Sequence, residues 1–144
     1  MKEKGKWAFI LDKDEFVRLS LNKILKKYGF QTEEIEDFSQ LEKRKKDVEG
    51  GMILADVEID VLEKGFPFLK RWNDRFILMT PLVTDELTLR LKKIGIHRIM
   101  KKPVDPRLLR KVIREISFPD GVKAPSFGKK GEGSHFIQKG GEVV

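Results

Sequence analysis

The chain has 144 residues, of which 40% are hydrophobic and 37% charged, with a formal net charge of +7 and no cysteine. This length and composition indicate one globular domain and exclude disulfides and thiolate chemistry. The two histidines are too few for a zinc site, and the first apolar run is too short for a signal peptide or a membrane span. We therefore expect a cytoplasmic protein without a membrane segment.

The chain begins with a strand and a helix. Residues 7–11 form a continuous apolar run, which is typical of a strand that is buried on both faces. The next segment, 14–28, predicts an amphipathic helix that starts at Asp14 and ends at Gly29. Its apolar stripe consists of Phe16, Val17, Leu21, Ile24, Leu25 and Tyr28.

The middle of the chain repeats this alternation less clearly. Residues 30–36 are compatible with a short edge strand, and 37–47 with a charged helix. Residues 52–55 predict a second buried strand. The segment 57–65 is ambiguous, and a helix is expected over 67–72.

The last third continues the pattern. Residues 76–79 predict a strand, 84–93 a helix and 96–100 a short strand. Asp105 is then expected to cap a final helix, with Pro106 at its first position. The buried stripe of that helix is predicted to be Leu108, Leu109, Val112, Ile113 and Ile116.

Strands that alternate with helices over short connections predict an α/β domain with helices on both faces of a parallel sheet. We expect this domain to span residues 1–117. Residues 118–144 contain six glycines and little apolar periodicity, so they predict a C-terminal extension without a separate fold. Phe127 and the segment 134–138 are the candidates for anchoring that extension.

Four polar residues follow predicted strands: Asp12, Asp56, Thr80 and Lys102. Reactive sites of parallel sheets lie beyond the carboxyl ends of the strands, so these four side chains are expected to face one edge. Two carboxylates suit Mg²⁺, while a lysine and a hydroxyl can neutralise and hydrogen-bond a phosphoryl group on an aspartate. The alternative is structural: the two aspartates cap turns, and the threonine and lysine are ordinary polar residues.

Because these residues occur in this order and at these strand ends, the chain resembles the receiver domain of two-component response regulators over about residues 6–116. The residues that carry the resemblance are Leu11-Asp12-Lys13-Asp14 with Arg18, Ile53-Leu54-Ala55-Asp56, Ile77-Leu78-Met79-Thr80, and Lys102-Pro103 with Asp105-Pro106.

The resemblance implies a flavodoxin-like fold with a five-stranded parallel sheet in the order 2-1-3-4-5. It implies phosphoryl transfer from a histidine kinase or phosphotransfer protein to Asp56, with Thr80 and Lys102 contacting the phosphoryl group. It also implies Mg²⁺ on Asp12 and Asp56. Such a domain is a phosphoacceptor rather than an enzyme.

The sequence departs from the family pattern where a second acidic residue is usual, because this position holds Lys13. A protonated lysine cannot coordinate a cation, so Mg²⁺ binding is expected to be weakened. The Lys13 ammonium is expected near Asp56, in the electrostatic role of the metal, or paired with Glu58. Asp14 is the residue that could compensate, although it is one position further along the chain.

Three further departures surround the same site. Pro81 follows Thr80 where the family has a small residue, and Ile99 stands where it has an aromatic one. The proline expected soon after Asp56 is also missing. Together these changes predict weakened or altered phosphorylation.

Three functions remain open. The first is a single-domain response regulator that binds a downstream protein through residues 82–116, which carry 10 basic and 4 acidic side chains. The second is a pseudo-receiver that is not phosphorylated because of Lys13. The third, a nucleic-acid-associated protein using the basic 82–116 face, is disfavoured because no aromatic stacking platform accompanies the charge. A homodimer is compatible with all three.

Overall fold

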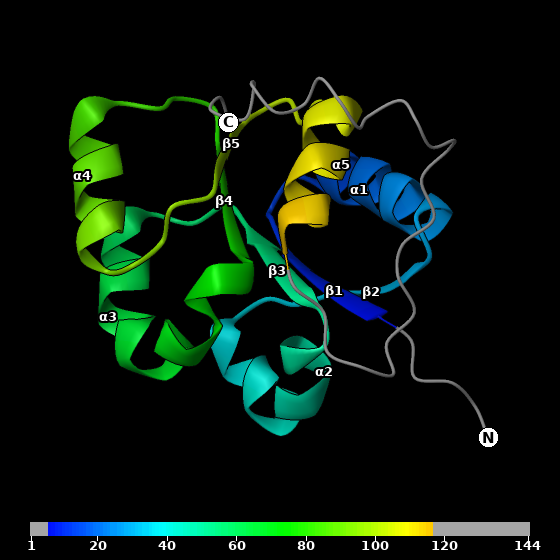
Figure 1. Ribbon diagram of the computed structural model, residues 1–144, viewed down its shortest axis with the longest axis horizontal. Coiled ribbons are helices and arrows are strands. Elements are labelled where there is room, and N and C mark those ends of the chain that lie inside the picture. Colours follow the sequence, from blue (N-terminus) through cyan, green and yellow to red (C-terminus); the bar gives the residue numbers. More distant parts are fainter. Residues whose placement is uncertain (1–5, 117–144) are drawn as a thin grey trace.

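The computed structural model describes residues 6–116, which form a parallel five-stranded sheet between two layers of helices (Figure 1). The strand order is β2-β1-β3-β4-β5, so the predicted flavodoxin-like topology is confirmed. The strands are β1 Lys6–Leu11, β2 Phe30–Glu34, β3 Met52–Ala55, β4 Phe76–Thr80 and β5 Ile99–Lys101.

Within residues 6–116, four α-helices and two short 3₁₀ helices connect the strands, and a fifth α-helix follows the last strand (Figure 1). They are α1 Glu15–Lys27, η1 Phe38–Lys43, α2 Lys45–Glu49, α3 Ile59–Leu69, η2 Lys70–Arg75, α4 Asp85–Lys93 and α5 Pro106–Glu115. Helices α1 and α5 cover one face of the sheet, and α2, α3 and α4 cover the other.

The core consists of two apolar layers because successive strand side chains point to opposite faces. Along β1, Ala8 and Ile10 pack toward α1 and α5, whereas Phe9 packs toward α2 and α3. All four side chains of β3 are buried, as expected for a central parallel strand with helices on both sides. This double burial explains why the sequence shows continuous apolar runs rather than alternation.

The predicted ends of α1 and α4 and the predicted start of α5 are confirmed. The side chains of Asp14, Thr84 and Asp105 each accept a backbone hydrogen bond in the first turn of α1, α4 and α5. Gly29 and Gly95 follow α1 and α4 with φ angles of 91° and 84°, a conformation that side chains with a Cβ rarely adopt. These caps fix where the chain leaves each helix and returns to the sheet.

The predicted continuous helix over 37–47 is wrong, because η1 and α2 are separate elements that meet at Arg44. The Arg44 backbone is not helical, with φ −123° and ψ 25°. Its guanidinium lies 4.5 Å from the centre of the Trp7 ring and pairs with Glu33 and Asp47. Contacts with β1 and β2 therefore accompany the break, and a reading of the local sequence could not include them.

The ambiguous segment 57–65 and the predicted helix 67–72 also need correction. Helix α3 begins at Ile59 and continues past Pro67, and η2 follows it directly. The prediction placed Pro67 near a helix start, where proline is common. The informative signal is the pair Leu62 and Leu69, which are seven residues apart and both buried in one layer of the core.

Strand β5 begins three residues later than the predicted strand 96–100. The backbone amide of Ile96 donates to the Leu91 carbonyl at 2.9 Å, so Ile96 closes the end of α4 instead. Two residues of the predicted apolar stripes are exposed: Phe16 is 80% exposed and Leu108 is 40% exposed. Both lie in the first turn of their helix, at the carboxyl edge where the sheet ends.

The predicted extension 118–144, with Phe127 and 134–138, lies outside the described residues, and the domain boundary remains a prediction. Among residues 6–116, none of the helices combines the length and the apolar character that crossing a membrane requires.

Gly51 offers a test of the packing between β1 and β3. A Cβ atom at this position would lie 1.9 Å from the Trp7 carbonyl oxygen, so Gly51→Ala must displace backbone. We expect it to lower the free energy of unfolding by roughly 2–3 kcal/mol. The matched control is Gly65→Ala in α3, where a Cβ would meet only Leu69 Cδ1 at 3.6 Å.

The control is expected to be neutral or to stabilise by up to about 1 kcal/mol, because alanine favours helix. Urea denaturation of both variants measures the two values. Equal effects on the free energy of unfolding would contradict the close approach at Gly51.

Candidate functional site

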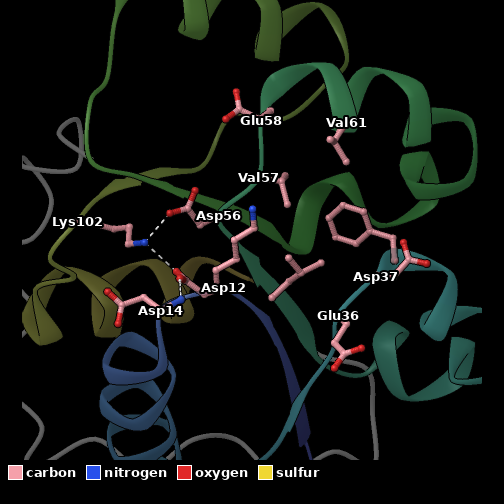
Figure 2. Close-up of a pocket in the computed structure, with 12 residues that line it drawn as sticks. Asp12, Asp14, Glu36, Asp37, Asp56, Val57, Glu58, Val61 and Lys102 are labelled. Atoms are coloured by element: carbon pink, nitrogen blue, oxygen red, sulfur yellow. Dashed lines mark hydrogen bonds and ion pairs between the residues drawn. The ribbon is translucent and has the colours of Figure 1, made fainter.

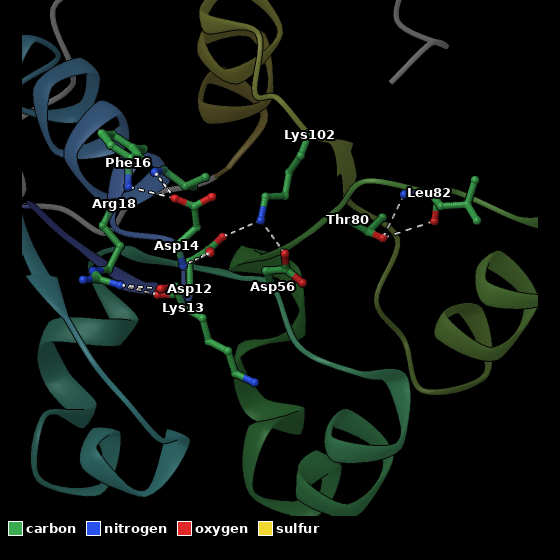
Figure 3. A network of polar contacts seen from close by, with 10 residues as sticks. Asp12, Lys13, Asp14, Phe16, Arg18, Asp56, Thr80, Leu82 and Lys102 are labelled. Atoms are coloured by element: carbon green, nitrogen blue, oxygen red, sulfur yellow. Dashed lines mark hydrogen bonds and ion pairs between the residues drawn. The ribbon is translucent and has the colours of Figure 1, made fainter.

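Three of the predicted site residues meet at the carboxyl edge of the sheet (Figure 3). Lys102 Nζ donates to Asp12 Oδ2 at 2.8 Å and to Asp56 Oδ2 at 2.5 Å. Asp12 directly follows β1, Asp56 follows β3, and Lys102 follows β5. The predicted convergence of these side chains is therefore confirmed.

Hydrogen bonds of the sheet continue into the site and fix its backbone. The Asp56 amide donates to the Leu11 carbonyl at 2.9 Å, beyond the last paired residues of β1 and β3. The Lys102 amide donates to the Thr80 carbonyl at 2.8 Å in the same way. The backbones of Asp56 and Lys102 are thus tied to the ends of the neighbouring strands, which positions their side chains.

The three charged side chains differ in exposure. The exposed fraction is 2% for Asp12, 14% for Lys102 and 29% for Asp56. Both Asp12 oxygens are used, because Oδ1 accepts from the Asp14 amide at 2.8 Å and Oδ2 from Lys102. Asp56 is therefore the carboxylate that a reagent from solvent can reach.

Burial of the Lys102 ammonium acts to lower its pKa, but the hydrogen bonds to Asp12 and Asp56 outweigh burial. The pKa of Lys102 consequently lies above its ordinary value of 10.5. Lys102 is charged at neutral pH and neutralises part of the repulsion between the two carboxylates.

Thr80 lies at the same edge, but its hydroxyl is bound to the following loop (Figure 3). The hydroxyl donates to the Leu82 carbonyl at 3.1 Å and accepts from the Leu82 amide at 3.2 Å, which closes a turn around Pro81. The structure brings Thr80 near the charged cluster without joining it by a hydrogen bond.

The expected contacts of Lys13 are not formed. Among residues 6–116 it makes no ion pair with Asp56 or Glu58, and Figure 3 shows its ammonium directed away from Lys102. In place of Lys13, Lys102 supplies the ammonium that contacts Asp56. Asp14 does not compensate either, because its carboxylate caps α1 by accepting from the amides of the first turn.

A pocket of about 510 Å³ opens beside the cluster (Figure 2). Lys13 and Glu58 both line it, which places them at the site although neither forms an ion pair with another described residue there. Carboxylates dominate the polar lining, and one wall is apolar. The lining residues are Leu11, Asp12, Lys13, Asp14, Glu36, Asp37, Phe38, Asp56, Val57, Glu58, Val61 and Lys102.

These residues fit Mg²⁺ poorly. Within the described part of the chain, no group of three or more histidine, cysteine, aspartate or glutamate side chains is arranged to hold a metal. The two available carboxylates, Asp12 and Asp56, share the Lys102 ammonium, and a lysine stands at position 13. A hard cation would have to compete with the Lys102 ammonium for the charge of these two carboxylates.

Sequence reasoning missed the residues that support this loop. Arg18 entered only as part of the motif, without a role, and Glu34 did not enter at all. In the structure, Arg18 donates to two backbone carbonyls of the site loop and pairs with Glu34. The position of Arg18 one turn into α1 was a usable signal, whereas Glu34 meets it only through the pairing of β1 with β2.

A family model described as the response regulator receiver domain matches residues 8–114. Among solved structures, chemotaxis protein CheY4 of Vibrio cholerae is similar with a TM-score of 0.63 and 21% identity, covering 79% of this chain and 100% of that one. The signal receiver domain of a modulated diguanylate cyclase from Desulfovibrio desulfuricans gives 0.62 and 17%, covering 78% and 94%. No curated protein matches the chain.

A third similar structure is a putative pilus assembly protein from Burkholderia thailandensis, with a TM-score of 0.55 and 14% identity, covering 76% of this chain and 98% of that one. At such identities the solved structures establish the shared fold and nothing finer. The family model is the comparison that classifies the chain.

Lys102→Met tests the electrostatic role of the lysine. Removing the charge leaves two neighbouring carboxylates without their cation, so the free energy of unfolding is expected to fall by about 2 kcal/mol at neutral pH. The pKa of Lys102 is raised in the folded protein, so its stabilisation is complete below pH 10.5 and is lost as the pH rises through the raised value.

Urea denaturation of both proteins, from neutral pH to above pH 10.5, measures this difference. The control is Lys101→Met, which removes the exposed neighbouring lysine and should change stability little. A wild-type advantage that is independent of pH across this range would contradict the charge argument.

Proposed function

Because this chain belongs to the response regulator receiver domain family, we propose that it accepts a phosphoryl group on Asp56 in two-component signalling and then acts by binding another protein. The observation that carries the proposal is the contact of Lys102 with Asp56, the most exposed carboxylate of the cluster. A histidine kinase or phosphotransfer protein is the proposed donor.

The two oxygens of Asp56 differ. Oδ2 binds Lys102, whereas Oδ1 accepts no hydrogen bond from the residues that the structure describes. In the proposed reaction Oδ1 forms the new bond to phosphorus as the phosphorus–nitrogen bond of the donor phosphohistidine breaks. The electron pair of that bond returns to the imidazole, and Lys102 stabilises the charge on the phosphoryl oxygens.

The proposed output surface is the face formed by residues 82–116. Side chains of Val83, His97, Ile99, Lys101 and Leu108 help line a groove of about 410 Å³ on this face. Val83 is 42% exposed and Leu108 is 40% exposed, so the groove offers apolar area to a partner protein. A homodimer and a cytoplasmic location stay predictions.

The basic charge of this face does not favour nucleic acid as the partner. Arg90 pairs with Asp60 and Glu63 of α3, and Arg98 donates to backbone carbonyls. Lys102 is bound within the site. These side chains are engaged inside the protein, so fewer positive charges are available for phosphate backbones than the sequence suggests.

Acetyl phosphate with Mg²⁺ tests phosphorylation directly. We expect the wild type to gain the mass of one phosphoryl group and Asp56→Asn to gain none, because only a carboxylate can form the acyl phosphate. Intact-protein mass spectrometry measures the change, and beryllofluoride binding gives an independent spectral readout. An unmodified wild-type mass together with an unchanged spectrum would rule out the phosphoacceptor role.

The second candidate function is a pseudo-receiver, an interaction module that is not phosphorylated. The observation that favours it is that the residues described at this edge do not form a fitting Mg²⁺ site: Lys13 stands where the family has a carboxylate, and Lys102 lies between Asp12 and Asp56. Receiver domains typically bind Mg²⁺ at this acidic pocket. A chain without that metal would keep the fold and the groove but would not respond to phosphoryl donors.

Lys13→Asp separates these two functions. The substitution adds a carboxylate to the pocket and removes an ammonium, so Mg²⁺ affinity is expected to rise from undetectable to a dissociation constant on the order of millimolar. Titration followed by tryptophan fluorescence or NMR measures it, with Lys13→Ala as the control for losing the charge alone. A wild-type protein that already binds Mg²⁺ and labels normally would exclude the pseudo-receiver.

A further inference from the structure

The loop that follows β1 is held by a single arginine (Figure 3). Arg18 Nη1 donates to the backbone carbonyl of Asp12 at 2.9 Å and to that of Lys13 at 3.1 Å. The Asp14 amide donates to Asp12 Oδ1 at 2.8 Å, which closes a turn centred on Lys13. The backbone and the reactive-edge carboxylate of Asp12 are therefore fixed together.

The arginine is itself oriented from outside the loop. Arg18 Nε donates to Glu34 Oε1 at 3.1 Å, and the second oxygen of Glu34 accepts from Asn22 Nδ2 at 2.9 Å. Glu34 ends β2, and Asn22 lies one turn further along α1. The Arg18 side chain is only 26% exposed. Charge-assisted hydrogen bonds of this kind are the stronger ones in proteins, so the guanidinium has a defined position.

The contacts of Arg18 bear on the positions of the Asp12 carboxylate and the Lys13 ammonium. Figure 3 shows the Arg18 guanidinium on one side of the loop and the Lys13 side chain leaving on the other. With both carbonyls held, the loop keeps the Asp12 carboxylate toward Lys102 and the Lys13 ammonium away from it. Without Arg18, the loop could reorient and bring the Lys13 ammonium to the carboxylates.

We propose that Arg18 is a positioning residue of the site: it acts through the Asp12 and Lys13 carbonyls to keep Asp12 on Lys102 and Lys13 out of the Asp56 contact. This inference rests on the proposed function, because it assigns Arg18 to the centre where Asp56 would react. Glu34 serves to orient Arg18. Neither residue touches the phosphoryl group.

Site-resolved amide hydrogen exchange by NMR tests this role on unphosphorylated protein without Mg²⁺ or phosphodonor. Arg18→Gln is expected to speed exchange of the Asp14 amide about tenfold relative to core amides such as Ile10 and Leu54, as the turn opens locally. Arg18→Lys keeps the charge and one donor group, so a smaller increase is expected. Partial rescue by lysine separates positioning from general destabilisation.

The matched control is Arg98→Gln. Arg98 also donates to two backbone carbonyls, those of Asp74 at 2.5 Å and Glu115 at 3.4 Å, far from the site loop in the sequence. The Arg98→Gln variant is expected to leave the exchange rate of the Asp14 amide, relative to core amides, unchanged. The proposal is overturned if Arg18→Gln speeds Asp14 and core exchange equally or leaves both unchanged, or if Arg98→Gln has the same local effect.

The outcome does not depend on phosphorylation. If Asp56 takes no phosphoryl group but Arg18→Gln selectively speeds Asp14 exchange, the phosphoacceptor role fails and the positioning role stands. If Asp56 is labelled and Asp14 exchange is not selectively changed, the positioning role fails alone.

Discussion

The site depends on one electrostatic constraint: two carboxylates face each other at the end of a buried sheet, and a single ammonium lies between them. Asp12 is almost fully buried, so its charge needs a partner inside the protein, and Lys102 supplies it. The same ammonium contacts Asp56, which remains open to solvent on its other side. Parallel strands make this possible because β1, β3 and β5 all deliver their following residue to one edge.

Most of the fold could be predicted because the determining signals are local. Apolar runs such as 7–11 and 52–55 indicate strands, and capping residues such as Asp14 and Asp105 indicate where helices start. The errors occurred where tertiary contacts decide the outcome. Arg44 interrupts a helical segment as it stacks on Trp7, and no local pattern contains that contact.

The sequence predicted which residues come together at the site, but it did not predict which of their charges form ion pairs. Asp12, Asp56 and Lys102 each follow a predicted strand, which is why they were expected to lie together, and they do. The expected ion pair of Lys13 with Asp56 or Glu58 was wrong for the described residues 6–116, because sequence position does not say on which side of a loop a flexible side chain lies. In the structure, Arg18 donates to the backbone carbonyls of the loop that contains Lys13. Arg18 is in turn bound by Glu34 of strand β2, which is distant in the sequence.

The ion pair between Lys102 and Asp12 joins residues 90 positions apart in the chain. Because this separation spans the sheet from the end of β1 to the end of β5, the pair forms only when the intervening chain has closed into the domain. The site at Asp56 is therefore complete only in the finished domain. Any molecule that recognises the assembled charge cluster would therefore recognise the folded domain and not a short segment of the chain.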